Sequence, residues 1–183
     1  SNSTVTICNN QLPYTWNGLS LTAAGNYSVT LVNAAGCDSV VNLTLHVNPV
    51  TYSQTVSSVC SADLPYVWNG QSYNTAGNHM ITLTNQYGCD SIATLQLTIN
   101  QTPTAPTVIP AISYCQFAVA AQLTANGNHN LIWYTTNTGG TGSTQAPTPA
   151  THTPGMQQFY VSQHTGFCES ERVAITVTIN PKP

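Results

Sequence analysis

The chain of 183 residues carries two basic and five acidic side chains, which is 4% charged residues and a formal net charge of −3. An average soluble domain carries about 25% charged residues. So few Lys and Arg argue against nucleic acid as a partner, because there is no counterion release to drive binding, and against an anionic membrane surface. Thr and Asn supply 46 of the 183 residues, so we expect exposed faces of hydroxyl and amide groups.

No stretch of the chain approaches the roughly 18 apolar residues of a membrane-spanning helix, and no basic and apolar leader opens it. The last four residues, AsnProLysPro, have the composition of a linker. We therefore expect an interior piece of a longer exported protein, with no membrane insertion.

The first hundred residues consist of one segment and its repeat. Residues 7–48 return without a gap as residues 59–100, 52 positions later. The alignment superimposes Cys8 on Cys60, Trp16 on Trp68, Gly25 on Gly77, Cys37 on Cys89 and Asp38 on Asp90. Such self-similarity indicates an array of modules.

Each repeat shows the period-two alternation of half-buried strands. In the first repeat Tyr27, Val29 and Leu31 alternate with polar residues, residues 33–36 form a short turn with Gly36, and a second strand follows. The apolar face of that strand is Val41, Leu43, Leu45 and Val47, which Ala93, Leu95, Leu97 and Ile99 repeat. This predicts a closing hairpin in every module.

From about residue 103 the chain continues as a longer variation. We expect a strand over residues 131–136, loop or a bare edge strand over residues 137–150, and a closing hairpin after residue 160. Its inward face is Val173, Ile175, Val177 and Ile179. No region has helical periodicity, which predicts an all-β fold.

We predict three domains: residues 1–50, residues 51–102 and residues 103–183. The first two are small β-sandwich repeats and the third is a longer Ig-like β-sandwich. The breaks in alternation at residues 49–55 and 101–107 contain Pro and are short, so we expect stiff joints and an extended rod of tandem modules.

The six cysteines are interpreted as disulfides of an oxidising compartment. Because both repeats should pair their own two cysteines in the same way, we pair Cys8 with Cys37 and Cys60 with Cys89, and then Cys115 with Cys168. Each bond would close its own small module. A zinc site is not supported, because the sequence contains no CxxC pair.

The repeat motif resembles the repeats of giant surface adhesins in gliding and biofilm-forming Bacteroidetes. Its elements are Cys, LeuPro, Tyr, TrpAsnGly, AlaGlyAsn and GlyCysAspSer, in that order. Residues 103–183 resemble the Ig-like domain that accompanies gliding-motility-associated C-terminal regions, through LeuThrAla, LeuIleTrpTyrThr, GlyGlyThrGlySer, AlaProThrPro, TyrValSerGln and CysGluSer. The resemblance implies a large protein exported by type IX secretion to the bacterial cell surface.

Aromatic residues are candidate sugar-stacking platforms. Trp16 with Tyr14, and Trp68 with Tyr66, precede AsnGly in the two repeats, and Tyr134 follows Trp133. The alternative is that each Trp fills the core of a module that has few large side chains. For the third segment we expect Trp133 to point inward and Tyr134 outward.

Ser39 and Ser91 are candidate O-glycosylation sites, because AspSerVal and AspSerIle resemble the acceptor motif of secreted Bacteroidetes proteins. The alternative is that each Asp caps a turn and each Ser begins a strand. Asp38, Asp63 and Asp90 are too sparse for calcium. We expect no metal and no cofactor.

Nothing in the sequence favours an enzyme, since the five histidines are scattered and no acid pair faces a cleft. We predict a structural and adhesive stalk segment of a secreted adhesin that presents weak multivalent surfaces, with polysaccharides or surface glycans and neighbouring repeats as partners. The alternatives are a carbohydrate-binding accessory module of a polysaccharide-degrading enzyme, and a subunit of a self-assembling fibre.

Overall fold

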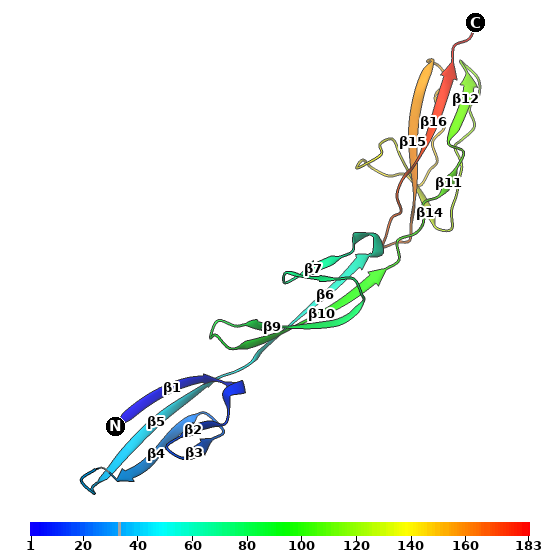
Figure 1. The fold of residues 1–183 in the computed structure, drawn as a ribbon. Helices are drawn as coiled ribbons and strands as arrows, with labels where there is room; N and C mark the ends of the chain where they lie inside the picture. The colour runs from blue at the N-terminus through cyan, green and yellow to red at the C-terminus, as the bar shows by residue number, and fades with distance from the viewer. Residues whose placement is uncertain (33) are drawn as a thin grey trace. The chain divides into compact units, whose positions relative to one another are not determined.

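The computed structural model describes residues 1–32 and 34–183, which form an all-β fold (Figure 1). Within these residues the helical elements are two 3₁₀ turns, η1 (Asn9–Gln11) and η2 (Ser61–Asp63). None of the helical elements described is long and apolar enough to span a bilayer.

The described chain forms two compact units. One contains residues 1–57 and 75–98, and the other contains residues 58–74 and 99–183. Each of the three predicted domains nevertheless holds a main sheet of its own, in the orders β1-β5-β4, β6-β10-β9 and β12-β16-β15-β14. The division into three domains at the predicted boundaries stays a prediction.

The sheet of the first repeat has β5 (Asp38–Asn48) at its centre. β4 (Gly25–Val32) pairs with β5 antiparallel, which is the predicted closing hairpin. The predicted turn at residues 33–36 lies partly outside the described residues. β1 (Asn2–Cys8) pairs with the other edge of β5 in parallel, so that Cys8 lies opposite Asn48 at the end of β5.

A short hairpin of β2 (Tyr14–Trp16) and β3 (Leu19–Leu21) covers this sheet. The buried cluster between them consists of Ile7, Leu21, Leu43 and Leu45. The predicted alternation of β5 is confirmed, because Leu43 and Leu45 are buried, Thr44 between them is half-buried, and Asn42 and His46 on either side are exposed. The burial of a few large side chains is the main source of stability in so small a layer pair.

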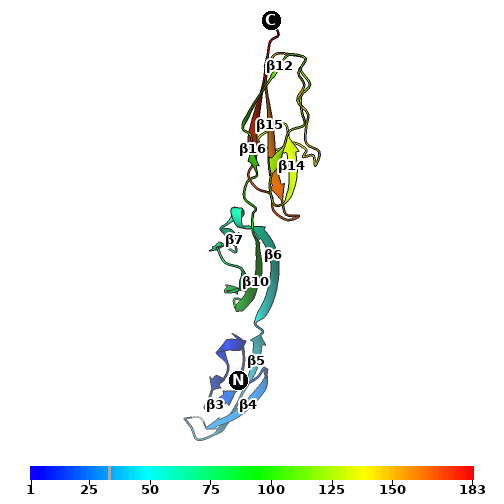
Figure 2. The ribbon, with the colours of Figure 1, turned by 90° about the vertical axis from the view of Figure 1, so that its right-hand side faces the viewer.

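The second repeat reproduces these elements. They are β6 (Thr51–Cys60), β7 (Tyr66–Trp68), β8 (Gln71–Tyr73), β9 (Gly77–Thr84) and β10 (Asp90–Asn100). β9 and β10 form the antiparallel hairpin, and β6 lies at the other edge of β10 (Figure 2). Ala93, Leu95 and Leu97 are buried, as the alternation predicts.

The third segment has a four-stranded sheet in which β16 (Val173–Asn180) pairs in parallel with β12 (Ala111–Cys115) and antiparallel with β15 (Gly155–His164). β14 (Asn130–Tyr134) is the edge strand (Figure 2). A two-stranded ribbon of β11 (Thr107–Val108) and β13 (Ala125–Asn126) completes the segment. Its core contains Leu123, Trp133, Val161, Ile175, Val177 and Ile179.

The predicted cysteine pairing is wrong. The structure joins Cys8 to Cys89 and Cys60 to Cys168, and Cys37 and Cys115 belong to neither bond. The reason is the parallel pairing of β1 with β5, which places Cys8 beside the end of β5, while Cys37 immediately precedes its start. A strand of this length runs about 33 Å, at roughly 3.3 Å per residue, and a disulfide requires Cα atoms within about 7 Å.

Candidate functional site

The two disulfides follow one rule. Cys8 and Cys60 each end the first strand of their segment, whereas Cys89 and Cys168 each lie in the turn of the next segment's closing hairpin. The Cα atoms of the bonded pairs are 5.4 Å and 5.7 Å apart. Each bond therefore joins the end of the first strand of one segment to the hairpin turn of the following segment.

Polar contacts support the junction at Cys8–Cys89. The Asn10 side-chain amide donates to the Asp90 carboxylate at 2.8 Å, and the Asn85 amide donates to the carbonyl of Pro49 at 3.3 Å. Asn85 Oδ1 also accepts the backbone N–H groups of Tyr87 and Cys89 at 2.9 Å and 3.1 Å. The side chain that caps this turn is thus Asn85, and Asp90 binds the preceding segment instead.

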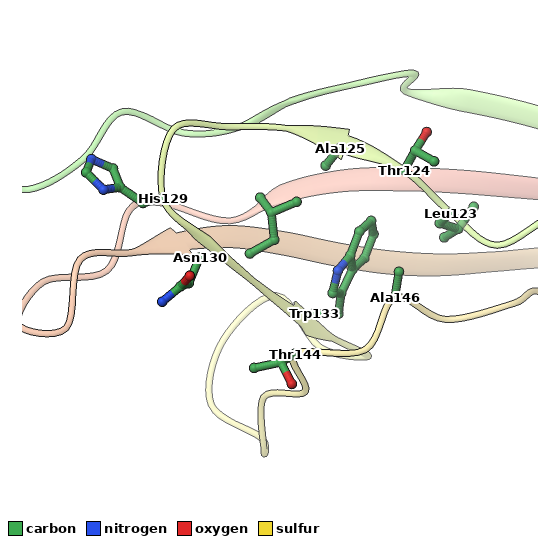
Figure 3. Close-up of a pocket in the computed structure, with 9 residues that line it drawn as sticks. Leu123, Thr124, Ala125, His129, Asn130, Trp133, Thr144 and Ala146 are labelled. Atoms are coloured by element: carbon green, nitrogen blue, oxygen red, sulfur yellow. The ribbon is translucent and has the colours of Figure 1, made fainter.

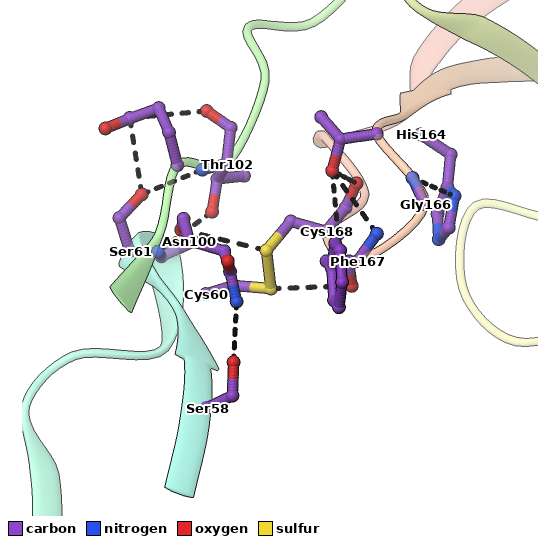
Figure 4. Close-up of a disulfide and its surroundings, with 12 residues drawn as sticks. Ser58, Cys60, Ser61, Asn100, Thr102, His164, Gly166, Phe167 and Cys168 are labelled. Atoms are coloured by element: carbon purple, nitrogen blue, oxygen red, sulfur yellow. Dashed lines mark hydrogen bonds between the residues drawn. A yellow bond between two sulfur atoms is a disulfide. The ribbon is translucent and has the colours of Figure 1, made fainter. Parts of the chain in front are cut away.

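The junction at Cys60–Cys168 has polar contacts of a different kind (Figure 4). Each sulfur lies 3.7 Å from a backbone carbonyl of the opposite side, that of Phe167 or Asn100. The Asn100 amide donates to Ser58 Oγ at 2.7 Å, and the Gln163 amide donates to the carbonyl of Thr104 at 2.9 Å. The first joint is therefore held by a sulfur bridge and by side-chain amides, and the second joint by a sulfur bridge whose two ends are each hydrogen-bonded within their own segment.

A groove of about 510 Å³ runs beside the edge strand β14 of the third segment (Figure 3). Its apolar wall is Leu123, Ala125, Leu131, Trp133 and Ala146. Thr124, His129, Asn130 and Thr144 supply its polar groups. The far side is fixed by the hydrogen bond from Leu123 N–H to the Pro147 carbonyl at 2.9 Å, and one end by that from His129 N–H to Gln163 Oε1 at 2.8 Å.

The chemistry of this groove is apolar with neutral hydrogen-bonding groups. Hydroxyl, amide and imidazole side chains both donate and accept hydrogen bonds, and no carboxylate, Lys or Arg side chain lines the groove among the described residues. Such a surface suits an uncharged polyhydroxylated chain better than an ion.

The tryptophans of the repeats lie on β2 and β7, next to tight turns. Asn17 and Gly18 have positive φ angles of 45° and 81°, and the second repeat has the same AsnGly conformation. Two such residues make the preferred two-residue hairpin loop. The AsnGly pairs that we assigned to candidate sugar-stacking platforms are therefore hairpin turns, a signal present in the sequence that we did not use.

The four aromatic side chains of these hairpins are half-buried. Tyr14 and Trp16 pack against the core cluster of the first repeat. Tyr66 and Trp68 are also half-buried, and the Trp68 ring lies 6.0 Å from Tyr73 at an interplanar angle of 57°. The packing is what a core role requires, and sugar stacking by these residues stays a prediction.

The expectation for Tyr134 is wrong. Its ring is buried at 9% exposure, the guanidinium of Arg172 lies 3.2 Å above the ring centre, and Gly142 approaches Ile132 and Tyr134 so closely that no Cβ would fit there. The ring is therefore not the exposed platform that we expected. Trp133 is buried at 4%, as predicted.

Arg172 organises the loop that covers Tyr134. One guanidinium nitrogen donates to the carbonyls of Thr136 and Gly139 at 2.9 Å and 2.7 Å, and Nε lies 3.9 Å from Glu169. Burial raises the pKa of the Tyr134 hydroxyl, and Glu169 raises it further. This cluster was not predicted from the sequence, although a lone Arg in so uncharged a chain was a usable signal.

Ser39 and Ser91 lie in β5 and β10, opposite Leu31 and Leu83, and both are half-buried. Their use as glycan attachment sites stays a prediction. Within residues 1–32 and 34–183, no three His, Cys, Asp or Glu side chains come close enough together to hold a metal ion.

Residues 103–181 match the family described as Ig-like domain CHU_C associated. No curated protein matches the chain. Among solved structures, Sidekick-1 immunoglobulin domains 1–4 are 12% identical with a TM-score of 0.34, and the alignment covers 89% of this chain and 60% of that one. Protocadherin Gamma B7 extracellular cadherin domains 1–4 are 7% identical with a TM-score of 0.29, over 87% and 58%. The chain thus spans less than two thirds of these structures.

Proposed function

We propose that this chain is a structural and adhesive segment of a large secreted bacterial adhesin. In this role it spaces a binding region from the cell surface and transmits pulling force. The observation that carries the proposal is the pair of disulfides, each of which couples one segment covalently to the next. A crosslink between successive segments resists separation under load, which a crosslink confined to one segment does not.

Three further observations support this assignment. Disulfides persist in oxidising, extracytoplasmic surroundings. The match of residues 103–181 to an Ig-like domain family fits a module without catalysis. The uncharged surface of Thr and Asn side chains favours weak, repeated contacts with glycans, which gain strength by multivalency. We also propose export by type IX secretion and a part in gliding, because the sequence motifs resemble those of gliding-associated surface proteins.

A shear-flow assay tests the proposal in the bacterium that encodes the chain. Cells that carry Cys60→Ser with Cys168→Ser in the full-length protein should attach normally in still medium and detach at lower shear than unmodified cells. Antibody labelling of intact cells controls for the amount of protein on the surface. Equal detachment shear at equal surface amount contradicts a load-bearing role, and failure of the antibody to label intact cells contradicts surface location.

The groove beside β14 favours a second function, carbohydrate binding by the third segment. An apolar wall with neutral polar groups fits a sugar chain. Electrophoresis in polysaccharide-containing gels tests this function, because binding retards migration. The test variant is Asn130→Ala, since Asn130 lines the groove, and the matched control is Asn180→Ala, since Asn180 ends β16 and does not line the groove. Retardation lost in the first variant alone supports binding in the groove, whereas unretarded migration of the unmodified chain in every gel contradicts it.

A further inference from the structure

Cys115 is an exposed thiol that neither disulfide uses. It ends β12, as Cys8 ends β1 and Cys60 ends β6. The strand pairing around Cys115 is also the same as around Cys8. Cys115 lies opposite Asn180 in a parallel strand pair, as Cys8 lies opposite Asn48. Cys115 therefore occupies the strand-end position of the third segment.

The other two strand-end cysteines both have the same kind of partner. Cys8 is bonded to Cys89 and Cys60 to Cys168, and each of these partners lies in the hairpin turn of the next segment along the chain. The rule holds wherever the described chain contains a following segment. Applied to Cys115, it specifies a turn cysteine in a segment beyond residue 183.

The surroundings of Cys115 are organised as at the other joints. Gln116 N–H donates to the Asn180 carbonyl at 2.8 Å, and Gln116 Oε1 accepts the Lys182 N–H at 3.4 Å, so the outgoing chain is held beside the cysteine. At the second joint, Thr102 N–H donates in the same way to Ser61, the residue after Cys60.

The end of the third segment also exposes apolar surface. Phe117 is 64% exposed and Val119 is 96% exposed. Phe117 is two residues after Cys115, the position at which Asn10, two residues after Cys8, contacts Asp90 of the next segment. The residue that meets the neighbour in the first joint is thus replaced here by a largely exposed aromatic ring, which contacts the ring of His152 and which another segment would bury.

We propose that Cys115 forms a disulfide with the hairpin-turn cysteine of a further β-segment that follows in the same protein. The two thiols lose two protons and two electrons and form one S–S bond. A carrier disulfide, either a thiol–disulfide oxidoreductase or oxidised glutathione, takes up both electrons and protons and is released as two thiols. The third segment is then coupled to its successor as the first two segments are coupled to theirs.

The first experiment supplies the missing segment. A copy of residues 51–102 is added after Pro183, and its strand-end cysteine, the copy of Cys60, is replaced by Ser. Cys37→Ser is also introduced, so that Cys37 cannot compete with the copy of Cys89 as the turn thiol that bonds to Cys115. After oxidation with oxidised glutathione, alkylation and pepsin digestion at acid pH, mass spectrometry should find Cys115 linked to that turn cysteine. Cys8–Cys89 and Cys60–Cys168 should remain, and Cys115→Ser should leave the new turn cysteine open to alkylation.

The proposal is overturned if Cys115 is alkylated while both original disulfides are intact and the added segment resists proteolysis. If the added segment is digested, the natural full-length protein decides the matter. It is isolated after the thiols are blocked, and its Cys115 should be joined to a downstream turn cysteine. Alkylated Cys115, or Cys115 joined to glutathione or to another chain, overturns the proposal. The mapping reads the bond alone, so its failure is distinguishable from failure of the adhesive role in the shear assay.

Discussion

Reduction of the two disulfides should lengthen the mechanically extended chain more than threefold. With both bonds intact, the shortest covalent path runs from residue 1 to Cys8, across to Cys89, back to Cys60, across to Cys168 and on to residue 183. This path has about 51 residue steps, and at roughly 3.3–3.6 Å per step, with the two bridges added, it extends to about 190 Å. The reduced chain of 183 residues extends to about 630 Å.

Single-molecule force spectroscopy measures these lengths when the chain is attached through ligase tags at both ends, which leaves the cysteines untouched. Pulling is carried out with and without a phosphine reductant. The variant Cys60→Ser with Cys168→Ser keeps one bond and should extend to about 350 Å, on the same length per residue.

An oxidised length near 260 Å would refute the covalent path described above, because it is about the value for three bonds that each close one segment. An oxidised length near that of the reduced chain would refute it as well, because it would mean that neither bond forms.

Three other outcomes are expected. Ile175 is fully buried, so Ile175→Ala should lower the free energy of unfolding in a denaturant titration by about 2–5 kcal/mol, and Ile109→Ala at a 62% exposed position should change it by less than about 0.5 kcal/mol. The raised pKa of Tyr134 means that the unfolded chain loses this proton first as the pH passes 10.0, so the melting temperature should fall above that pH, and Tyr134→Phe should reduce the fall; an unchanged slope would show that another group titrates. Native protein should exceed its polypeptide mass, and Ser39→Ala should remove part of the excess; a native mass equal to the bare oxidised polypeptide would end the glycosylation hypothesis.

The strands were predictable because their signal is local. Leu43 and Leu45 alternate with polar residues within a few positions, and one buried face is enough to produce that pattern. The hairpin of β4 and β5 follows from a short connection between two such strands. The AsnGly turn between β2 and β3 was equally available to sequence reasoning and was overlooked.

The disulfide pairing was not predictable from the repeat. Alternation in β1 is the same whether its neighbour runs parallel or antiparallel, yet this choice decides which end of β5 Cys8 reaches. We assumed that the two cysteines of one repeat bond to each other. In the structure, Cys8 and Cys60 each bond to a cysteine of the following segment. The burial of Tyr134 was missed for a similar reason, since its cover is a loop held by Arg172, 38 residues further along the chain.

The overlap of the two sulfur bridges has a consequence for survival among extracellular proteases. Because Cys60 lies between Cys8 and Cys89 in the sequence, three stretches of backbone connect the same two bridges: residues 8–60, 60–89 and 89–168. A cleavage in any one of them, including the exposed glycine-rich loop after Tyr134, releases no fragment, and neither do single cleavages in two of them. With one cut per stretch, residues 8–168 stay in one covalent piece until all three stretches have been cut.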